Sequence, residues 1–182
     1  MNILASKEQL RASFLRWALF LVPLIVLLGF ISGQLGNPST QWFQGLTKPA
    51  IFPPPAIFGV VWTVLWLMIG FAVALVASAW GARGRGIALI AFALHFLGTL
   101  AWTPVFFGLQ DMTSALYVLM YAAITLLIVI VLFWKVRRTA ALLLVPYFCW
   151  VCFAAALNYQ FIAENPDGGV DDESGAAVEI TL

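Results

Sequence analysis

Five long intervals without a charged residue constrain the fold of this chain more than any other feature. Each exceeds the roughly 20 residues that an α-helix needs to cross about 30 Å of hydrocarbon. The chain is also 63% hydrophobic and only 9% charged, with a mean hydropathy of +1.00, far outside the range of ordinary water-soluble domains. The sequence therefore predicts an integral membrane protein with five spans. The intervals are 17–47, 49–82, 86–110, 112–134 and 139–163.

Two other interpretations fit these intervals less well. An outer-membrane barrel needs many segments of about 10 residues with alternating polarity, whereas these intervals are continuously apolar. A cleaved signal peptide would explain only the first interval, and the apolar stretch 14–35 is too long for one and lacks a clear cleavage site. We therefore expect an all-α bundle of five transmembrane helices. Their expected bounds are 14–35, 55–80, 86–108, 112–134 and 139–163.

The segments between and beyond these helices differ in composition. Residues 1–13 form an N-terminal extension, and residues 164–182 form an acidic, Gly-rich tail that we expect to be disordered. The loop 36–54 is the one long connection, and its prolines and aromatic residues favour a structured lid over a flexible tether. The other loops are short, so neighbouring helices should be antiparallel and form one domain over 14–163.

Lys and Arg are distributed asymmetrically over the predicted loops. Eight of the nine lie at the N-terminal end and in the second and fourth loops, whereas Lys48 alone lies on the opposite side. The positive-inside rule then predicts a cytoplasmic N-terminus, an external C-terminus and an odd number of spans. We expect a multi-pass protein of the bacterial inner membrane.

Three of the predicted helices carry a stripe of aromatic and polar side chains. Residues three or four positions apart share one face of a helix. Polar side chains inside a bilayer are costly unless they face the bundle or a cavity, so these stripes should point inward. The stripes comprise Trp62 and Trp66 in the second helix, His95, Thr99 and the pair Trp102/Thr103 in the third, and Tyr147, Trp150, Ala154 and Asn158 in the fifth. Phe106 should close the end of the surface that the third helix forms.

Two arrangements of the stripes remain open at this point. Either the polar groups satisfy one another in a packed core, or they line a pocket for a flat, mostly apolar ligand. His95 is the single histidine, so the chain cannot supply the paired imidazoles of a membrane haem protein, and we expect no metal site. Cys149 and Cys152 form a C-x-x-C pattern inside an apolar helix, where we expect buried small side chains rather than redox chemistry.

Four sequence motifs together resemble one known family. They are, in chain order, "WFQGLTKP", "PPPAIFGVVWTVLWLMIG", "WTPVFFG" and "PYFCWVCFAAALNYQFIAEN". This arrangement is similar to the TspO/MBR family of tryptophan-rich sensory proteins, relatives of the mitochondrial translocator protein. The resemblance implies five transmembrane helices, usually in a homodimer, with a ligand cavity in each subunit closed by the first loop. Family members bind porphyrins such as protoporphyrin IX, many bind sterols or benzodiazepine-type drugs, and some bacterial members are reported to degrade porphyrin in light.

The resemblance also implies roles for individual positions. Trp62 and Trp150 match two positions tied to ligand chemistry in bacterial members, and Tyr147 and Asn158 also fall on family positions. Four residues of the first loop match the family's Lys-Pro and Pro-Pro patterns, and with Trp42 they should belong to the lid. These four are Lys48, Pro49, Pro53 and Pro54.

One departure from the family pattern concerns the third helix. Its polar pair is typically glutamine and asparagine in the family, but here it is His95 and Thr99. The resemblance therefore implies a retained pocket with altered polar contacts. A C-terminal sterol motif is absent, since no Lys or Arg follows Tyr159, and this weakens a cholesterol interpretation.

The sequence as a whole predicts a membrane receptor or carrier for a tetrapyrrole or a similarly flat, sterol-like molecule. The role would be sensory, regulatory or transport, with no required cofactor and no nucleic-acid partner. Two other classes stay open. A porphyrin-degrading enzyme would use Trp62 and Trp150 as indoles that exchange electrons with a porphyrin activated by light or oxygen. A regulatory scaffold would bind another membrane protein and no small molecule.

Overall fold

The computed structural model describes residues 7–168, and within that range every regular element is helical. Five helical spans are long and apolar enough to cross a membrane, which confirms the predicted all-α architecture. The expected disorder of the acidic tail falls largely on 169–182, outside the described residues. The elements are α1 (Lys7–Gln34), α2 (Gln41–Gly45), α3 (Pro55–Ala77), α4 (Arg85–Thr99), η1 (Pro104–Gly108), α5 (Met112–Val136) and α6 (Arg138–Glu164).

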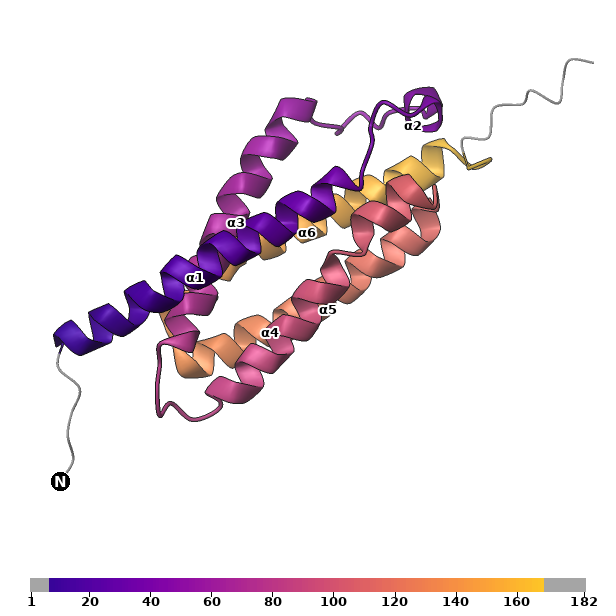
Figure 1. The fold of residues 1–182 in the computed structure, drawn as a ribbon. Helices are drawn as coiled ribbons and strands as arrows, with labels where there is room; N and C mark the ends of the chain where they lie inside the picture. Colours follow the sequence, from indigo (N-terminus) through magenta and orange to yellow (C-terminus); the bar gives the residue numbers. More distant parts are fainter. Residues whose placement is uncertain (1–6, 169–182) are drawn as a thin grey trace, which may run out of the picture.

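Four of the spans form a bundle, and α1 covers one side of it (Figure 1). Helix α5 packs between α4 and α6, α6 packs on α3, and α1 lies along α3. The short helix α2 lies in the first loop, near the end of α6 (Figure 1). The arrangement places the lid loop over one end of the bundle and the arginine-rich loops at the other.

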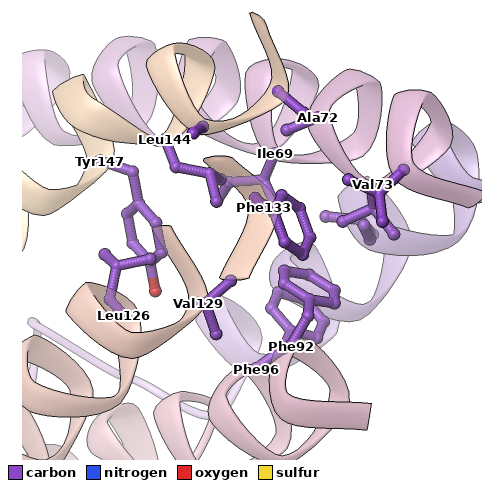
Figure 2. Packing of buried hydrophobic residues seen from close by; sticks show 14 of the residues in the cluster. Ile69, Ala72, Val73, Phe92, Phe96, Leu126, Val129, Phe133, Leu144 and Tyr147 are labelled. Atoms are coloured by element: carbon purple, nitrogen blue, oxygen red, sulfur yellow. The ribbon is translucent and has the colours of Figure 1, made fainter. Parts of the chain in front are cut away.

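The core at the arginine-rich end consists of close-packed apolar side chains (Figure 2). Phe92 stacks on Phe96 with 5.6 Å between ring centroids, and it contacts Phe133 of α5 at 6.1 Å. Leu126 lies beside Tyr147 of α6 in the same cluster (Figure 2). This packing holds α4, α5 and α6 together and positions the polar residues further along the same helices.

Most helix ends lie close to their predicted positions. Helix α5 begins after Asp111, whose carboxylate accepts a hydrogen bond of 2.8 Å from the Ser114 amide, as expected for an N-cap. Helix α1 begins seven residues earlier than predicted, at Lys7, because charged residues are also good helix formers and the helix continues past the apolar interval. Helix α3 ends at Ala77 rather than residue 80, before a turn with a left-handed glycine at Gly81.

The third span is not the single α-helix over 86–108 that the sequence predicted. The α-helix ends at Thr99, and residues Pro104–Gly108 form a π-helical turn in which the Leu109 amide donates to the Pro104 carbonyl at 2.9 Å. Proline has no amide hydrogen, so Pro104 cannot donate to the Leu100 carbonyl four residues earlier. The Ser32 hydroxyl of α1 donates to that carbonyl instead, at 2.9 Å. The helix type therefore changes at Pro104.

Candidate ligand-binding site

Five rings from three helices meet inside the bundle, and we refer to them as the inner ring cluster. Trp62 of α3 lies at its centre, with centroid distances of 5.8 Å to Trp66, 6.2 Å to Tyr147 and 6.4 Å to Trp150. His95 of α4 joins the cluster through Tyr147, at 5.7 Å. The structure thus brings together aromatic residues from all three predicted stripes.

His95 is fully buried and has one satisfied and one unsatisfied ring nitrogen. Its Nδ1 lies 2.8 Å from Thr125 Oγ1, and the Thr125 hydroxyl donates to the Tyr121 carbonyl at 2.7 Å. Because the Thr125 hydrogen is used in that bond, we assign the hydrogen on the imidazole to Nδ1. Nε2 is then a bare acceptor, and it has no hydrogen-bond partner among residues 7–168.

Thr99 and Tyr147 form a second polar contact beside His95. The Thr99 hydroxyl donates to the His95 carbonyl at 2.8 Å, and the Thr99 side chain lies close enough to the Tyr147 hydroxyl to interact with it. Tyr147 is buried, whereas Thr99 is half-buried. Both residues therefore face inward and are partnered, in contrast to His95 Nε2.

Trp150 supplies the second unsatisfied polar atom of the cluster. Its Nε1 is buried and has no acceptor in the described part of the chain. The indole contacts Phe58 at 5.8 Å and Phe153 at 5.2 Å, so its surroundings are apolar. The inner ring cluster accordingly contains one unpaired acceptor and one unpaired donor, a combination that is rare in packed cores.

Trp102 and Phe106 belong to a separate cluster beneath the lid. Their rings stack at 5.2 Å, and Trp102 Nε1 donates to Asn158 Oδ1 at 3.2 Å. Asn158 is buried and donates from Nδ2 to the Met112 carbonyl at 2.8 Å. The end of α4 at Thr99 separates Trp102 from the regular helix, so the predicted stripe of the third span divides between two clusters.

The lid packs on these rings through aromatic contacts. Phe43 of α2 contacts Phe106, Phe107 and Phe161, and Trp42 meets Phe106 edge-on at 5.6 Å. These side chains bury the lid against η1 and the end of α6. The expectation that the first loop forms a structured lid fits this packing.

Lys48 stabilises the lid itself. Its ammonium donates to the carbonyls of Phe43 and Leu46, the latter at 2.8 Å, and lies 4.4 Å from the Phe43 ring centroid. Partial burial lowers the pKa of Lys48 from its ordinary value. Pro49 is buried, whereas Pro53 is half-buried and Pro54 exposed just before α3.

Asn165 ties the lid to α6, and the sequence motifs did not indicate this role. Its Oδ1 accepts from the Thr47 amide at 2.7 Å, and its Nδ2 donates to the Thr47 carbonyl at 3.0 Å. Trp42 Nε1 adds a bond to the Gly168 carbonyl at 2.9 Å. The sequence shows that Asn165 is a polar residue directly after an apolar helix. Its partner, Thr47, lies 118 positions away, so the neighbouring sequence could not identify it.

Three other positions complete the comparison with the sequence. Ala154 is half-buried on α6, between Trp150 and Asn158. Cys149 and Cys152 are exposed on the outer face of α6, so the expectation that they are buried is wrong. No group of three His, Cys, Asp or Glu residues within 7–168 could hold a metal ion.

The sequence model of the TspO/MBR family matches residues 20–163. The chain belongs to the TspO/MBR family. The resemblance seen in the motifs is thereby confirmed, and with the five spans it establishes an integral, multi-pass membrane protein. The match includes both ring clusters and the whole lid loop, whereas Asn165 lies just beyond it.

Several curated proteins are similar to this TspO/MBR chain. Tryptophan-rich protein TspO of Chlorobaculum tepidum is 34% identical over 131 residues, covering 71% of this chain and 83% of that protein. Tryptophan-rich sensory protein of Cereibacter sphaeroides is 33% identical over 150 residues, covering 82% and 92%. Human translocator protein is 34% identical over 140 residues, covering 75% and 79%.

Proposed function

We propose that this TspO/MBR protein is a membrane receptor or carrier that binds a tetrapyrrole of the protoporphyrin IX type, or a similarly flat apolar molecule. The observation that carries the proposal is the pair of unpartnered buried atoms in the inner ring cluster, His95 Nε2 and Trp150 Nε1. Leaving a buried polar group unpaired costs about 1–3 kcal/mol, so a ligand that pairs both atoms recovers that cost on binding.

A tetrapyrrole has the groups that this cluster lacks. It presents pyrrole N–H donors for His95 Nε2, ring-nitrogen or carboxylate acceptors for Trp150 Nε1, and a wide π-face for the indoles of Trp62 and Trp66. A sterol offers a single hydroxyl and no π-face. The pairing of donor, acceptor and aromatic surface therefore favours the tetrapyrrole over the sterol.

Ligand entry must displace the lid or part the rings. Trp62 contacts Trp66, Tyr147 and Trp150 directly, and the lid is bonded to the end of α6 through Asn165. We propose that a ligand enters between these rings when the lid detaches, which would link occupancy of the site to the position of the loop. Such a link suits a sensory role as well as a carrier role.

Titration of the purified protein with protoporphyrin IX in the dark tests this function. We expect saturable quenching of tryptophan fluorescence and a weaker apparent affinity in Trp62→Phe. Trp134→Phe is the matched control, because Trp134 is exposed and contacts Arg138 outside both ring clusters. Quenching that never saturates, or equal effects of the two variants, would contradict the proposal and favour the regulatory scaffold.

The contact between Trp62 and Trp150 favours a second candidate function. Their rings are nearly perpendicular, at 88°, with centroids 6.4 Å apart, so one ligand could touch both indoles. In light, an indole would give one electron to the excited porphyrin, which would pass it to dioxygen and form superoxide. The indole cation radical would then regain an electron from the porphyrin ring, and the oxidised ring would combine with superoxide, so that the net change is addition of dioxygen to the porphyrin. Illumination of the complex should then bleach the porphyrin absorbance in the wild type more than in Trp62→Phe and Trp150→Phe. Unchanged absorbance under light would exclude the enzyme but not the receptor.

We also propose a homodimer whose subunits have their arginine-rich end in the cytoplasm of a bacterial inner membrane. The distribution of Lys and Arg supports the orientation. In a background in which Cys149 and Cys152 are replaced by serine, Ser39→Cys in the exposed lid loop should react with an impermeant maleimide in whole cells. Labelling only after cell lysis would show that the protein has the opposite orientation in the membrane.

A further inference from the structure

A cleft of about 350 Å³ lies at the arginine-rich end of the bundle, far from the lid. Ser13, Arg16 and Trp17 of α1 line it together with Trp80, which follows α3. We propose that this cleft binds the phosphate-bearing headgroup of an anionic phospholipid. Its size is at the lower end of the range for small-molecule sites and suits a headgroup.

Trp80 forms a fixed wall of the cleft although it is 66% exposed. Its Nε1 donates to Ser13 Oγ at 3.2 Å, and its ring lies 6.3 Å from that of Trp17. The Arg85 guanidinium lies 4.2 Å from the Trp80 ring centroid and is itself held by a 2.9 Å bond from Nε to the Ala77 carbonyl. The wall is therefore ordered before any ligand arrives, which reduces the entropy lost on binding.

The cleft offers donors for a phosphate and no described acid that opposes it. Arg16 is exposed and forms no ion pair with any acid in 7–168. Ser13 accepts the bond from Trp80, so its own hydroxyl hydrogen can be donated to a phosphate oxygen. Arg85 does not line the cleft, but its guanidinium lies against the Trp80 ring and adds positive charge beside the site. Guanidinium groups are well suited to phosphate because they form paired, charge-assisted hydrogen bonds.

The surrounding charge is predominantly positive. Glu8 is the only acid of the described chain at this end. The other described acids lie at the lid side: Asp111 follows η1, Glu164 is the last residue of α6, and Asp167 follows α6. The Lys and Arg residues of this end are Lys7, Arg11, Arg16, Arg83, Arg85, Lys135, Arg137 and Arg138. An anionic ligand is therefore attracted to this end from a distance of about a Debye length.

A lipid fits the cleft better than free phosphate does. Tryptophan rings at helix ends mark the headgroup level of a bilayer. One helical turn further into the membrane, Phe20 of α1 is 60% exposed and offers an apolar surface for an acyl chain. The cleft therefore opens where a headgroup continues into its acyl chains, and a phosphate without chains would gain only the polar contacts.

Native mass spectrometry of the full chain in detergent tests the proposal. Phosphatidylglycerol and phosphatidylcholine are added in parallel, and we expect one phosphatidylglycerol to be retained preferentially. Arg16→Gln should lower the retained fraction about tenfold, as expected for the loss of a charge-assisted hydrogen bond. Arg83→Gln is the matched control, since it removes the same charge from an exposed residue outside the cleft. Ser13→Ala should give a smaller loss and tests the cleft if Arg16→Gln folds poorly.

Three results would overturn the proposal. They are equal retention of the two lipids, equal losses in Arg16→Gln and Arg83→Gln, and displacement of the lipid by an equal concentration of sn-glycerol 3-phosphate. The titration with porphyrin in the dark should give the same affinity in Arg16→Gln as in the wild type, because neither Arg16 nor Trp80 belongs to the inner ring cluster. Failure of this lipid site can therefore be distinguished from failure of the proposed porphyrin site.

Discussion

The Ser32 hydroxyl of α1 donates a hydrogen bond of 2.9 Å to the Leu100 carbonyl, to which Pro104 has no amide hydrogen to donate. The proline thus removes a hydrogen bond within one span, and a neighbouring span replaces it. The replacement fixes the end of α1 against the point where α4 gives way to η1. Since η1 carries Phe106 and Phe107, this single bond helps to set the surface on which the lid packs.

Ser32→Ala should destabilise the protein by about 0.6 kcal/mol, the average for hydrogen bonds between transmembrane helices. In a Pro104→Ala background the cost should be smaller, because the substituted alanine supplies an amide for the Leu100 carbonyl. Unfolding in detergent, compared across the four variants of this cycle, measures the difference. Ser39→Ala in the lid loop serves as a control, and equal costs of Ser32→Ala in both backgrounds would contradict the explanation.

Gly29 and Gly33 of α1 should respond differently to alanine. A Cβ at Gly29 would lie 2.3 Å from Cε2 of Trp66, whereas nothing lies within 4 Å of a Cβ at Gly33. Gly29→Ala must shift the Trp66 indole and should cost about 1–3 kcal/mol, as overpacking does. Gly33→Ala should be neutral or slightly stabilising, because alanine favours a helix. Thermal unfolding of both variants compares them, and similar midpoints would show that Trp66 moves aside freely.

His95 can be divided into its two functions with a pair of substitutions. Asparagine keeps a donor near the position of Nδ1 for Thr125 but removes the Nε2 acceptor, whereas glutamine keeps an atom at the ε position and loses the δ donor. His95→Asn should therefore bind protoporphyrin IX about five- to tenfold more weakly, since one hydrogen bond contributes about 1 kcal/mol. His95→Gln should lose mainly stability. The dark titration and an unfolding curve on each variant distinguish these outcomes, and the reverse ranking would place the ligand elsewhere.

Asn165→Ala should loosen the lid. The substitution removes both bonds to Thr47, which exposes the Thr47 amide to solvent. Hydrogen exchange at that amide should accelerate about thirtyfold, because the two lost bonds contribute about 1 kcal/mol each. Gln44→Ala is the control, since Gln44 lies in the same loop but its side chain bonds only the Pro38 carbonyl. Unchanged exchange in Asn165→Ala would mean that the aromatic contacts alone hold the lid.

Asp111 should make the stability of α5 depend on pH. Hydrogen bonds from Ser114 lower the pKa of Asp111, so the folded state binds this proton less tightly than the unfolded state does. The stabilisation is present above about pH 4 and is lost as the pH falls through the lowered pKa. Asp111→Asn also caps the helix but does not titrate. The difference in unfolding midpoint between the two proteins should shrink on acidification, and a constant difference would contradict the assignment.

The spans were predictable because a membrane imposes a local rule. A charge-free interval of sufficient length identifies each helix without any knowledge of its neighbours, and the Asp111 cap depends only on the next three residues. The sequence could not predict which group replaces the missing hydrogen bond after Thr99, because the partner of the Leu100 carbonyl is Ser32, 68 positions earlier. Pro104 indicated where regular pairing fails but not what replaces it.

The same distinction separates the predicted site residues from the missed ones. Because polar side chains are costly in contact with lipid, the sequence predicted that His95, Tyr147 and Asn158 face the inside of the bundle, and all three are buried. That cost does not say which helix supplies the partner, so Thr125 was missed. The exposure of Cys149 and Cys152 has a related cause, since apolar side chains are equally suited to the lipid-facing and the inward-facing sides of a span.

The clamp formed by Asn165 holds Thr47 only through its main-chain amide and carbonyl. Every residue except proline has both of these groups, so the two hydrogen bonds to Asn165 do not require a particular side chain at position 47. The side chain at position 47 can therefore change while both hydrogen bonds to Asn165 are kept. This part of the attachment thus depends on one asparagine side chain at the end of α6, whereas the aromatic contacts of the lid depend on the side chains of the loop itself.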